Sequence, residues 1–267
     1  MDAKGGGKAE SGRVALVTGG SRGVGRGITQ FLADSGVRVY VTGRSVACSD
    51  LPDNVARISC DHSDDAQVAA AFAQIEAEQG RLDILVNNAW GGYEKMVEEK
   101  EFTWNRPFWL QPLWRWDAMM SVGVRGALVA SQHAVRMMIR TGSGLIVNIS
   151  FWAAQKYVGN TLYGCAKAAT DKLTSDMAHE LAPHDISVVS LYPGLVRTEA
   201  VMAAAEFLDL SNSESPQFIG RAVHALAHDP RRMHRSGQVL IAAQLGLEYG
   251  FTDVDGRRPR PLCLGDI

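Results

Sequence analysis

Cysteine is scarce in this sequence, and its few cysteines form no motif. The 267 residues include four, and no two of them have CxxC spacing. A disulfide-rich scaffold and a zinc ribbon are therefore excluded, because both need closely spaced cysteines. Scattered thiols are typical of a reducing compartment, which predicts the cytoplasm.

Long apolar runs and an excess of one charge are also missing. No run of about 18 apolar residues occurs, so no membrane-spanning helix is predicted. The net charge is −2, and the basic groups at 231–235 and 257–260 are short. Such groups are typical of a solvated surface, and no nucleic-acid partner is predicted. The polar, glycine-rich segment MDAKGGGKAESG predicts a disordered arm over 1–12 and no secretory signal.

Several catalytic and metal-binding motifs are absent from the sequence. The glycines and lysine at 5–8 do not form a P-loop. His224 and His228 are four residues apart, but the glutamate of an HExxH motif is missing between them. Both histidines are expected on a helix surface, and no metal site is predicted.

The sequence does contain a regular alternation of apolar and helical segments. Seven short apolar segments lie at 14–18, 37–43, 56–60, 83–87, 144–150, 186–192 and 238–242. Segments with helical spacing, such as 64–79 and 116–140, lie between them. Apolar strands that alternate with helices predict a parallel sheet buried on both faces. We therefore predict a doubly wound, three-layer α/β (Rossmann) fold of about seven strands.

A single domain over 13–267 is expected, because no linker-like change of composition interrupts this alternation. Two segments interrupt the regular alternation of strands and helices. One is an aromatic insert at about 90–115, and the other is a helical excursion at about 198–216. We expect the excursion to be a mobile lid over the ligand site.

A glycine-rich turn, TGGSRGVGRG at 18–27, follows the first strand and opens a helix. Glycine lets the backbone turn sharply and approach a pyrophosphate, which then meets the N-terminus of the helix. A sharp turn requires glycine even without a ligand, but the position after the first strand favours dinucleotide binding. The candidate cofactor residues of this turn are Gly19, Gly20, Ser21, Arg22, Gly23 and Val24.

The end of the second strand indicates which dinucleotide binds. A carboxylate there would hold the 2′-hydroxyl of NAD(H), and an arginine would hold the 2′-phosphate of NADP(H). No acid lies between Asp34 and Asp50, whereas Arg44 follows the strand and Arg22 lies in the glycine turn. Two guanidinium groups favour NADP(H). The alternative is that both arginines are only solvated surface residues.

The stretch SFWAAQKYVGNTLYGCAK at 150–167 is the candidate reaction centre. A strand ends at Ser150, and a helix is predicted from about Thr161. Tyr163 and Lys167 are four residues apart and share a face of that helix. A charge about 4 Å away contributes about 4 kcal/mol, enough to lower a phenol pKa from ~10 toward ~7. We therefore expect Lys167 to lower the pKa of Tyr163 and to make it a proton donor and acceptor.

Together these motifs resemble the short-chain dehydrogenase/reductase family, in its single-domain branch. The matching residues are Thr18-Gly19-xxx-Gly23-x-Gly25, Asp61, Asn87-Asn88-Ala89, Ser150, Tyr163-xxx-Lys167 and Pro193-Gly194-xxx-Thr198. The resemblance implies an NADP(H)-dependent oxidoreductase that transfers a hydride between nicotinamide and the carbonyl or alcohol of a largely apolar small molecule. Tyr163 would transfer the proton, Lys167 would also bind the nicotinamide ribose, and Ser150 would hydrogen-bond the substrate oxygen.

The resemblance also implies the rest of the cofactor site. Asp61 and His62 would lie near adenine, and Asn88 and Ala89 near the adenosine ribose. The turn after the sixth strand would close over the nicotinamide and pyrophosphate through Pro193, Gly194, Val196 and Thr198. The helix at 161–182 resembles the family's dimer-forming helix, so a homodimer or homotetramer is expected.

The sequence departs from the family pattern at three places. Gly123 stands where the family has an asparagine that anchors a proton-relay water, and Trp90 interrupts the motif NNAG. Phe151 follows Ser150, so an alignment on the strand puts Phe151 in the serine's place, whereas the 13-residue count back from Tyr163 favours Ser150. These departures, with the tail YGFTDVDG at 249–256, indicate the member-one branch of the family. Gly123 also leaves open an alternative function, an NADP(H)-binding scaffold or regulatory protein with weak or lost catalysis.

Five of the six tryptophans fall between residues 90 and 116. They predict either an apolar wall for a bulky carbonyl substrate or a self-packed insert or subunit contact. The candidate residues of the substrate pocket are Trp90, Phe151, Trp152 and Tyr157.

Overall fold

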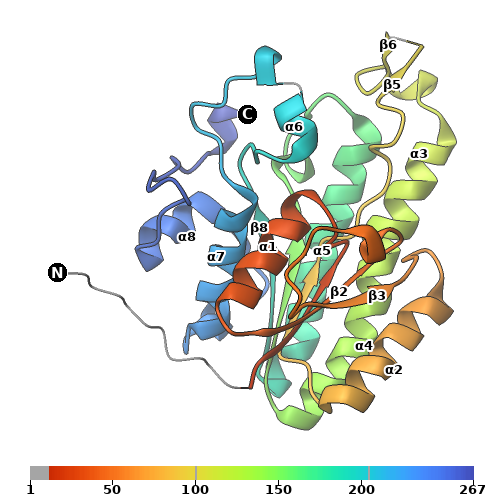
Figure 1. The fold of residues 1–267 in the computed structure, drawn as a ribbon. Helices are drawn as coiled ribbons and strands as arrows, with labels where there is room; N and C mark the ends of the chain where they lie inside the picture. The colour runs from red at the N-terminus through yellow and green to blue at the C-terminus, as the bar shows by residue number, and fades with distance from the viewer. Residues whose placement is uncertain (1–11, 100, 204) are drawn as a thin grey trace.

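The computed structural model describes residues 12–99, 101–203 and 205–267, so the predicted arm lies outside the described residues apart from Gly12. A seven-stranded parallel sheet forms the centre of the molecule, in the order β3-β2-β1-β4-β7-β8-β9 (Figure 1). All seven predicted strands are confirmed. They are β1 (Val14–Thr18), β2 (Arg38–Gly43), β3 (Ala56–Ser59), β4 (Ile84–Asn87), β7 (Gly144–Ile149), β8 (Ile186–Tyr192) and β9 (Val239–Ile241).

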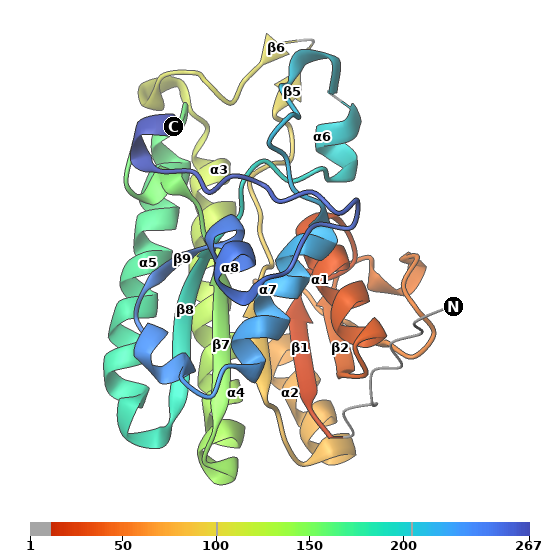
Figure 2. The same cartoon turned by 90° about the vertical axis from the view of Figure 1, so that its left-hand side faces the viewer.

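Helices cover both faces of the sheet, which confirms the doubly wound fold (Figure 2). The strands β1, β4 and β8 are buried along their whole length, because their side chains on each face pack against a helical layer. One layer contains α1 (Gly23–Asp34), α7 (Pro216–His228) and α8 (Ala242–Tyr249). The other contains α2 (Asp65–Gln79), α4 (Gly126–Thr141) and α5 (Thr161–Leu181).

Side-chain caps fix where the helices begin. Asp64 accepts hydrogen bonds from the backbone at the start of α2, and the Asn160 side chain accepts one from Tyr163 N at 3.0 Å. A capped N-terminus satisfies backbone donors that have no partner within the helix. The cap of Asn160 therefore fixes the first turn of α5, the turn that carries Tyr163.

The helix expected over 116–140 is divided into three pieces. α3 (Leu113–Ala118) leads into a π-helix, η3 (Met119–Arg125), and α4 follows. Short π-helical turns widen a helix, and they occur often at functional sites. Gly123 lies within this widened turn and is buried. Periodicity in the sequence does not distinguish such a turn from an ordinary α-helix.

The remaining elements are short. β5 (Val97–Glu98) and β6 (Glu101–Phe102) form an antiparallel pair, and α6 (Glu199–Ala203) lies in the predicted helical excursion. Figure 2 shows all three beyond the end of the strands at which the C-terminus also lies. The 3-10 helices are η1 (Val46–Cys48), η2 (Phe108–Leu110), η4 (Trp152–Ala154), η5 (Ala182–His184), η6 (Ala205–Phe207), η7 (Arg232–Arg235) and η8 (Leu264–Asp266). Among the described residues, no helix combines the length and apolar character needed to span a membrane.

Arg115 of α3 holds the aromatic insert together. Its guanidinium is completely buried and donates to the backbone oxygens of Lys95 and Thr103. It also donates to the side chains of Thr103 and Gln111 and lies 5.1 Å from the ring centroid of Trp114. These contacts join segments on both sides of the β5–β6 pair. The insert therefore has an ordered core built around a cation.

The first prediction concerns this cation. Arg115→Leu leaves the buried side-chain oxygen of Gln111 without its donor, and an unsatisfied buried acceptor costs about 1–3 kcal/mol. It also removes the charged hydrogen bonds to Lys95 O and Thr103 O, which keep Thr103 Oγ1 and Gln111 Nε2 as their donors. We expect the free energy of unfolding to fall by about 3 kcal/mol, as measured by urea denaturation. Arg106→Leu is the matched control, because Arg106 forms an exposed ion pair with Glu101 and should change stability by less than about 1 kcal/mol. Equal losses in the two variants would contradict the role of Arg115.

Candidate active site

The predicted site residues lie at the carboxyl ends of the strands. The strand order reverses between β1 and β4, because the chain proceeds to β2 and β3 on one side and to β7, β8 and β9 on the other. Ligands of doubly wound sheets bind at such a reversal. The turns after β1, β2, β3, β4, β7 and β8 all reach this edge, and the candidate residues belong to these turns and to the first turns of α5.

The glycine turn packs directly against the turn after β4. The Asn88 side chain donates to the backbone oxygens of Thr18 and Gly19, each at 3.0 Å. A Cβ on Gly19 would lie 2.7 Å from Ala89 Cα, and one on Gly25 would lie 2.3 Å from Asn88 Nδ2. Side chains at these glycines are therefore excluded. The structure brings the predicted residues Gly19, Asn88 and Ala89 together.

The N-terminus of α1 binds the carboxylate of Glu199 in this structure. Gly23 N–H donates to a Glu199 carboxylate oxygen at 3.0 Å, and Arg26 lies 3.4 Å from the other oxygen. Glu199 comes directly after Thr198, so the turn after β8 reaches the glycine turn. The free N–H groups at a helix N-terminus bind carboxylate and phosphate for the same reason. In this structure the N-terminus of α1 therefore binds a carboxylate.

The residues that follow β2 and β3 differ in how exposed their side chains are. The Arg44 side chain is 68% exposed and lies 3.4 Å from Glu94. Hydrogen bonds from Ser63 lower the pKa of Asp61. His62 is buried, its Nε2 lies 2.9 Å from Thr42 Oγ1, and burial lowers its pKa to about 4. His62 is thus neutral at pH 7, and Arg44 supplies positive charge at this edge; Arg22 in the glycine turn is also exposed.

Tyr163 and Lys167 lie side by side on α5, and both are buried. Lys167 Nζ donates to Ile149 O at 3.0 Å and lies 5.6 Å from the ring centroid of Tyr163. The Ser150 hydroxyl donates to Lys167 O at 3.4 Å. The strand end after β7 and the first turns of α5 are therefore joined through Lys167.

The pKa of Tyr163 moves opposite to the sequence prediction. Burial raises it well above its ordinary value, and the neighbouring Tyr93 adds to the rise. Burial also lowers the pKa of Lys167 to about 7, while Asp171 acts in the opposite direction. The attraction of the Lys167 charge lowers the pKa of a phenol, but removing both side chains from water disfavours their charged forms. In this structure the effect of burial on both pKa values is larger than the effect of that attraction.

Aromatic rings surround Tyr163. The ring centroids of Trp104, Trp90, Tyr93 and Phe151 lie 5.3, 5.7, 6.1 and 6.3 Å from that of Tyr163. Trp104 and Tyr93 belong to the insert, so part of the insert packs over the tyrosine. Aromatic composition pointed to this segment, but no spacing in the sequence identified Tyr93 or Trp104 as contacts of Tyr163.

The predicted pocket residues separate into two groups. Trp90 and Phe151 contact Tyr163, whereas Trp152 packs against Tyr192 at 5.3 Å and is buried. Tyr157 is 69% exposed. Phe151 thus faces the tyrosine, while the hydroxyl of Ser150 faces the backbone of α5.

Two buried carboxylates hold the turn after β8. Gly194 N donates to Glu214 Oε2 at 2.8 Å, and Arg197 pairs with Asp253 at 2.8 Å. Asp253 lies in the YGFTDVDG tail and also accepts from Ser215 N. Burial raises the pKa of Glu214 to about 7, against the opposing effect of Gly194 N–H. The sequence did not predict a role for Glu214 or Asp253, because nothing in their spacing connects them to Pro193 and Gly194.

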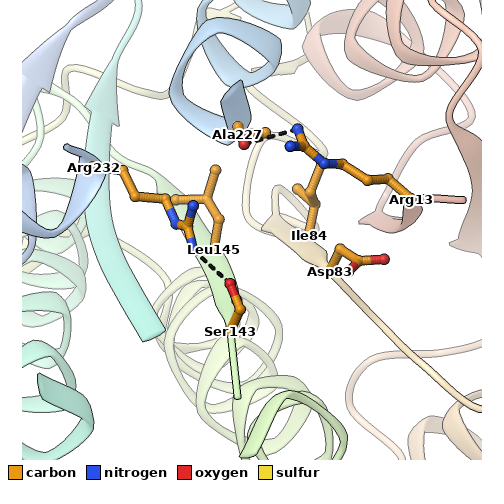
Figure 3. A pocket seen from close by; sticks show the side chains of 8 residues that line it. Arg13, Asp83, Ile84, Ser143, Leu145, Ala227 and Arg232 are labelled. Carbon is orange, nitrogen blue, oxygen red and sulfur yellow. Dashed lines mark hydrogen bonds between the residues drawn. The ribbon is translucent and has the colours of Figure 1, made fainter. Parts of the chain in front are cut away.

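A small cavity lies at the opposite edge of the sheet (Figure 3). It measures about 60 Å³ and is lined by residues that include Arg13, Asp83, Ser143 and Arg232. Arg13 donates to Ala227 O at 2.8 Å, and Arg232 donates to Ser143 Oγ at 2.5 Å. Ligand pockets usually measure about 300–1,000 Å³. The cavity is therefore too small for a dinucleotide.

Metal-binding groups are not clustered in the described residues. No three His, Cys, Asp or Glu side chains within 12–99, 101–203 and 205–267 are placed to hold one ion. His224 and His228 contact each other on α7, with ring centroids 4.0 Å apart. All four cysteines are free thiols.

Comparison with known proteins gives consistent matches. A family model described as short chain dehydrogenase matches residues 13–209. Dehydrogenase/reductase SDR family member 1 of Mus musculus is 40% identical, with 92% of this chain and 84% of that protein covered. The predicted branch is thereby confirmed. Short-chain reductase protein NovJ of Streptomyces niveus is 34% identical, with 92% of this chain and 94% of that protein covered.

A solved structure gives the same result for the fold. The 3-ketoacyl-(acyl-carrier-protein) reductase of Brucella melitensis, complexed with NADH, superposes with a TM-score of 0.73. The two chains are 26% identical, and the match covers 86% of this chain and 96% of that one.

The second prediction concerns Glu214. Its pKa is raised from 4.5 to about 7 in the folded chain, so its contribution to stability is complete below pH 4.5 and is lost as the pH rises through 7. Glu214→Gln removes this loss. We expect the free energy of unfolding of the variant to gain about 3 kcal/mol relative to wild type between pH 4.5 and 8. Urea denaturation at several pH values measures the difference.

The control for Glu214→Gln is Asp34→Asn, at the exposed end of α1. This variant should keep the same pH dependence as the wild type, because its carboxyl remains in water in both states. A Glu214→Gln curve parallel to the wild-type curve over the whole pH range would contradict the assignment.

Proposed function

Because this chain belongs to the short-chain dehydrogenase/reductase family, we propose that it is an NADP(H)-dependent oxidoreductase that acts on the carbonyl or alcohol of a largely apolar small molecule. The observation that carries this proposal is the burial of Tyr163 beside Lys167 within a group of aromatic rings. The two residues lie at the edge of the sheet where the glycine turn accepts an anion.

The nicotinamide cofactor supplies or accepts the hydride when it is bound. The glycine turn holds the pyrophosphate, and its neighbours Asn88 and Ala89 lie where the adenosine ribose is expected. Asp61 and His62 flank the adenine position. The turn after β8 covers the other end of the cofactor. The residues assigned to this turn are Pro193, Gly194, Val196 and Thr198.

Tyr163 exchanges the proton with the substrate oxygen. At its ordinary pKa of about 10 a phenol is already protonated at neutral pH, and burial raises the pKa of Tyr163 further. Tyr163 would therefore act as the proton donor in carbonyl reduction and, once deprotonated, as the proton acceptor in the reverse reaction. Lys167 supplies positive charge beside the tyrosine. Ser150 donates to the backbone at Lys167, so we assign it to holding this end of α5.

The substrate is expected to be apolar near its carbonyl group. Trp90, Tyr93, Trp104 and Phe151 form the surroundings of Tyr163. Rings in this arrangement exclude water and match an aromatic or aliphatic group. The hydroxyl of Tyr93 is the polar group of the insert that lies beside Tyr163, and 47% of Tyr93 is exposed. We place the entrance for the substrate on this side.

Two further assignments remain predictions. A homodimer or homotetramer is supported by an open groove of about 360 Å³ on the outer surface of η3, α4 and α5, lined by apolar side chains that include Met120, Val124, Leu128 and Leu173. The cytoplasm is the compartment predicted from the scattered thiols. A scaffold without catalysis is not favoured, because Tyr163 and Lys167 are both retained and lie together.

The third prediction tests the proton transfer. Tyr163→Phe removes the hydroxyl, and loss of a positioned proton donor reduces the rate by about 10²-fold or more. We expect kcat for NADPH-dependent reduction of a panel of ketones and aldehydes to fall by this factor, while the Kd for NADPH stays within about threefold. Tyr157→Phe, at an exposed tyrosine, is the control and should keep wild-type activity. Full activity of Tyr163→Phe would exclude the assigned role, and tight NADPH binding without turnover in wild type would support the scaffold.

The fourth prediction tests the choice of cofactor. Arg44→Ala removes a guanidinium that is assigned to the 2′-phosphate, and one charged contact contributes about 1.5–3 kcal/mol. We expect the Kd for NADPH to rise about tenfold or more, with little change for NADH. Fluorescence titration with both cofactors gives the ratio, and Arg22→Ala should act in the same direction. An equal effect on NADPH and NADH would show that neither arginine contacts the 2′-phosphate.

A further inference from the structure

Trp90 lies between the two residues assigned to proton transfer and the widened helix η3. Its ring centroid is 3.8 Å from Lys167 Nζ and 5.7 Å from the ring centroid of Tyr163, with an edge-on angle of 85° to that ring. An ammonium within about 6 Å of an aromatic ring centroid is attracted by the ring, most strongly by tryptophan. Trp90 is therefore in direct contact with the buried cation.

Gly123 provides the space for this ring. A Cβ at Gly123 would lie 2.5 Å from Cζ3 of Trp90 and 2.6 Å from Cε3. These atoms belong to a rigid ring, so a small side-chain rotation at the end of a flexible chain cannot relieve the contact. The indole thus occupies the space beside Gly123, the position where the family's asparagine would stand.

We propose that Trp90 is a positioning residue that holds the charged form of Lys167 beside Tyr163, and that residue 123 is glycine because the indole needs its space. The inference deepens the proposed oxidoreductase function and rests on it. It places an aromatic face against Lys167 on the side of the site where Gly123 replaces the family's asparagine.

The surroundings of Lys167 explain why such a contact matters. Its ammonium has three N–H groups and donates to one backbone oxygen, Ile149 O. Asp171, also on α5, acts to raise the pKa of Lys167, and Tyr163 lies beside Lys167. The Asp171 carboxylate accepts a hydrogen bond from the Tyr192 hydroxyl, and Tyr93 and Tyr192 act on the pKa of Tyr163.

Burial favours the neutral amine of Lys167, whose pKa lies at about 7. The indole acts in the opposite direction, because its negative face attracts the ammonium and not the neutral amine. The contact therefore keeps a larger fraction of Lys167 charged at neutral pH. A charged Lys167 is the form that favours loss of the proton from Tyr163.

The fifth prediction compares Trp90→Leu with Trp90→Phe. Both variants leave a smaller apolar side chain, but only phenylalanine keeps an aromatic face. We expect the pKa of Lys167 to fall by about 0.5–1 unit in Trp90→Leu and by a smaller amount in Trp90→Phe. Carbon NMR of lysine labelled at Cε measures it in the protein without added cofactor, and Lys167→Arg assigns the resonance. Equal pKa values in Trp90→Leu and wild type would overturn the proposal.

A pH profile of NADPH-dependent reduction provides the functional readout. The alkaline limb of kcat/KM should move to lower pH in Trp90→Leu and stay nearer to wild type in Trp90→Phe. The NMR titration separates the two possible failures, because it requires no turnover. An inactive wild type with the expected NMR shift would reject the proposed function alone, and an active wild type without the shift would reject the role of Trp90 alone.

A double-variant cycle tests the match between Trp90 and Gly123. Gly123→Asn alone introduces a Cβ against the indole and should lower Tm by several degrees. In the Trp90→Gly background, which has no indole to meet the new side chain, Gly123→Asn should lower Tm by much less than it does in wild type, so the two effects are not additive. Additive changes in Tm would contradict the steric link between the two positions. The cycle uses thermal unfolding and does not depend on activity.

Discussion

The burial of the Lys167 ammonium is the constraint on which the candidate site depends. A buried charge needs compensating contacts, and Lys167 finds them in Ile149 O and in the face of Trp90. Burial also raises the pKa of Tyr163. Removal from water thus disfavours the charged form of both residues.

The secondary structure around these residues places them with little freedom. Asn160 caps α5 one turn before Tyr163 and also donates to Trp104 O at 2.8 Å. One side chain therefore joins the start of the helix to the aromatic insert. Arg115 then fixes the insert from within. The aromatic surroundings of Tyr163 are in this way tied to the sheet through α5.

The cofactor edge is held by contacts between segments that are distant in the sequence. Glu199 reaches the glycine turn, Glu214 holds Gly194, and Asp253 of the tail holds Arg197. The turn after β8 thus connects the first helix, the region before α7 and the C-terminal tail. The tail after the last strand therefore supplies a buried carboxylate to the turn after β8.

The sequence by itself determined the seven strands, the doubly wound order and the shared face of Tyr163 and Lys167 on α5. Each of these follows from local patterns, namely apolar runs, glycine turns and a spacing of four residues. Only the tertiary structure decided that Phe151 faces Tyr163, that Trp90 lies on Lys167 and that desolvation raises the pKa of Tyr163. These results depend on burial and on contacts between separate turns, which periodicity does not encode.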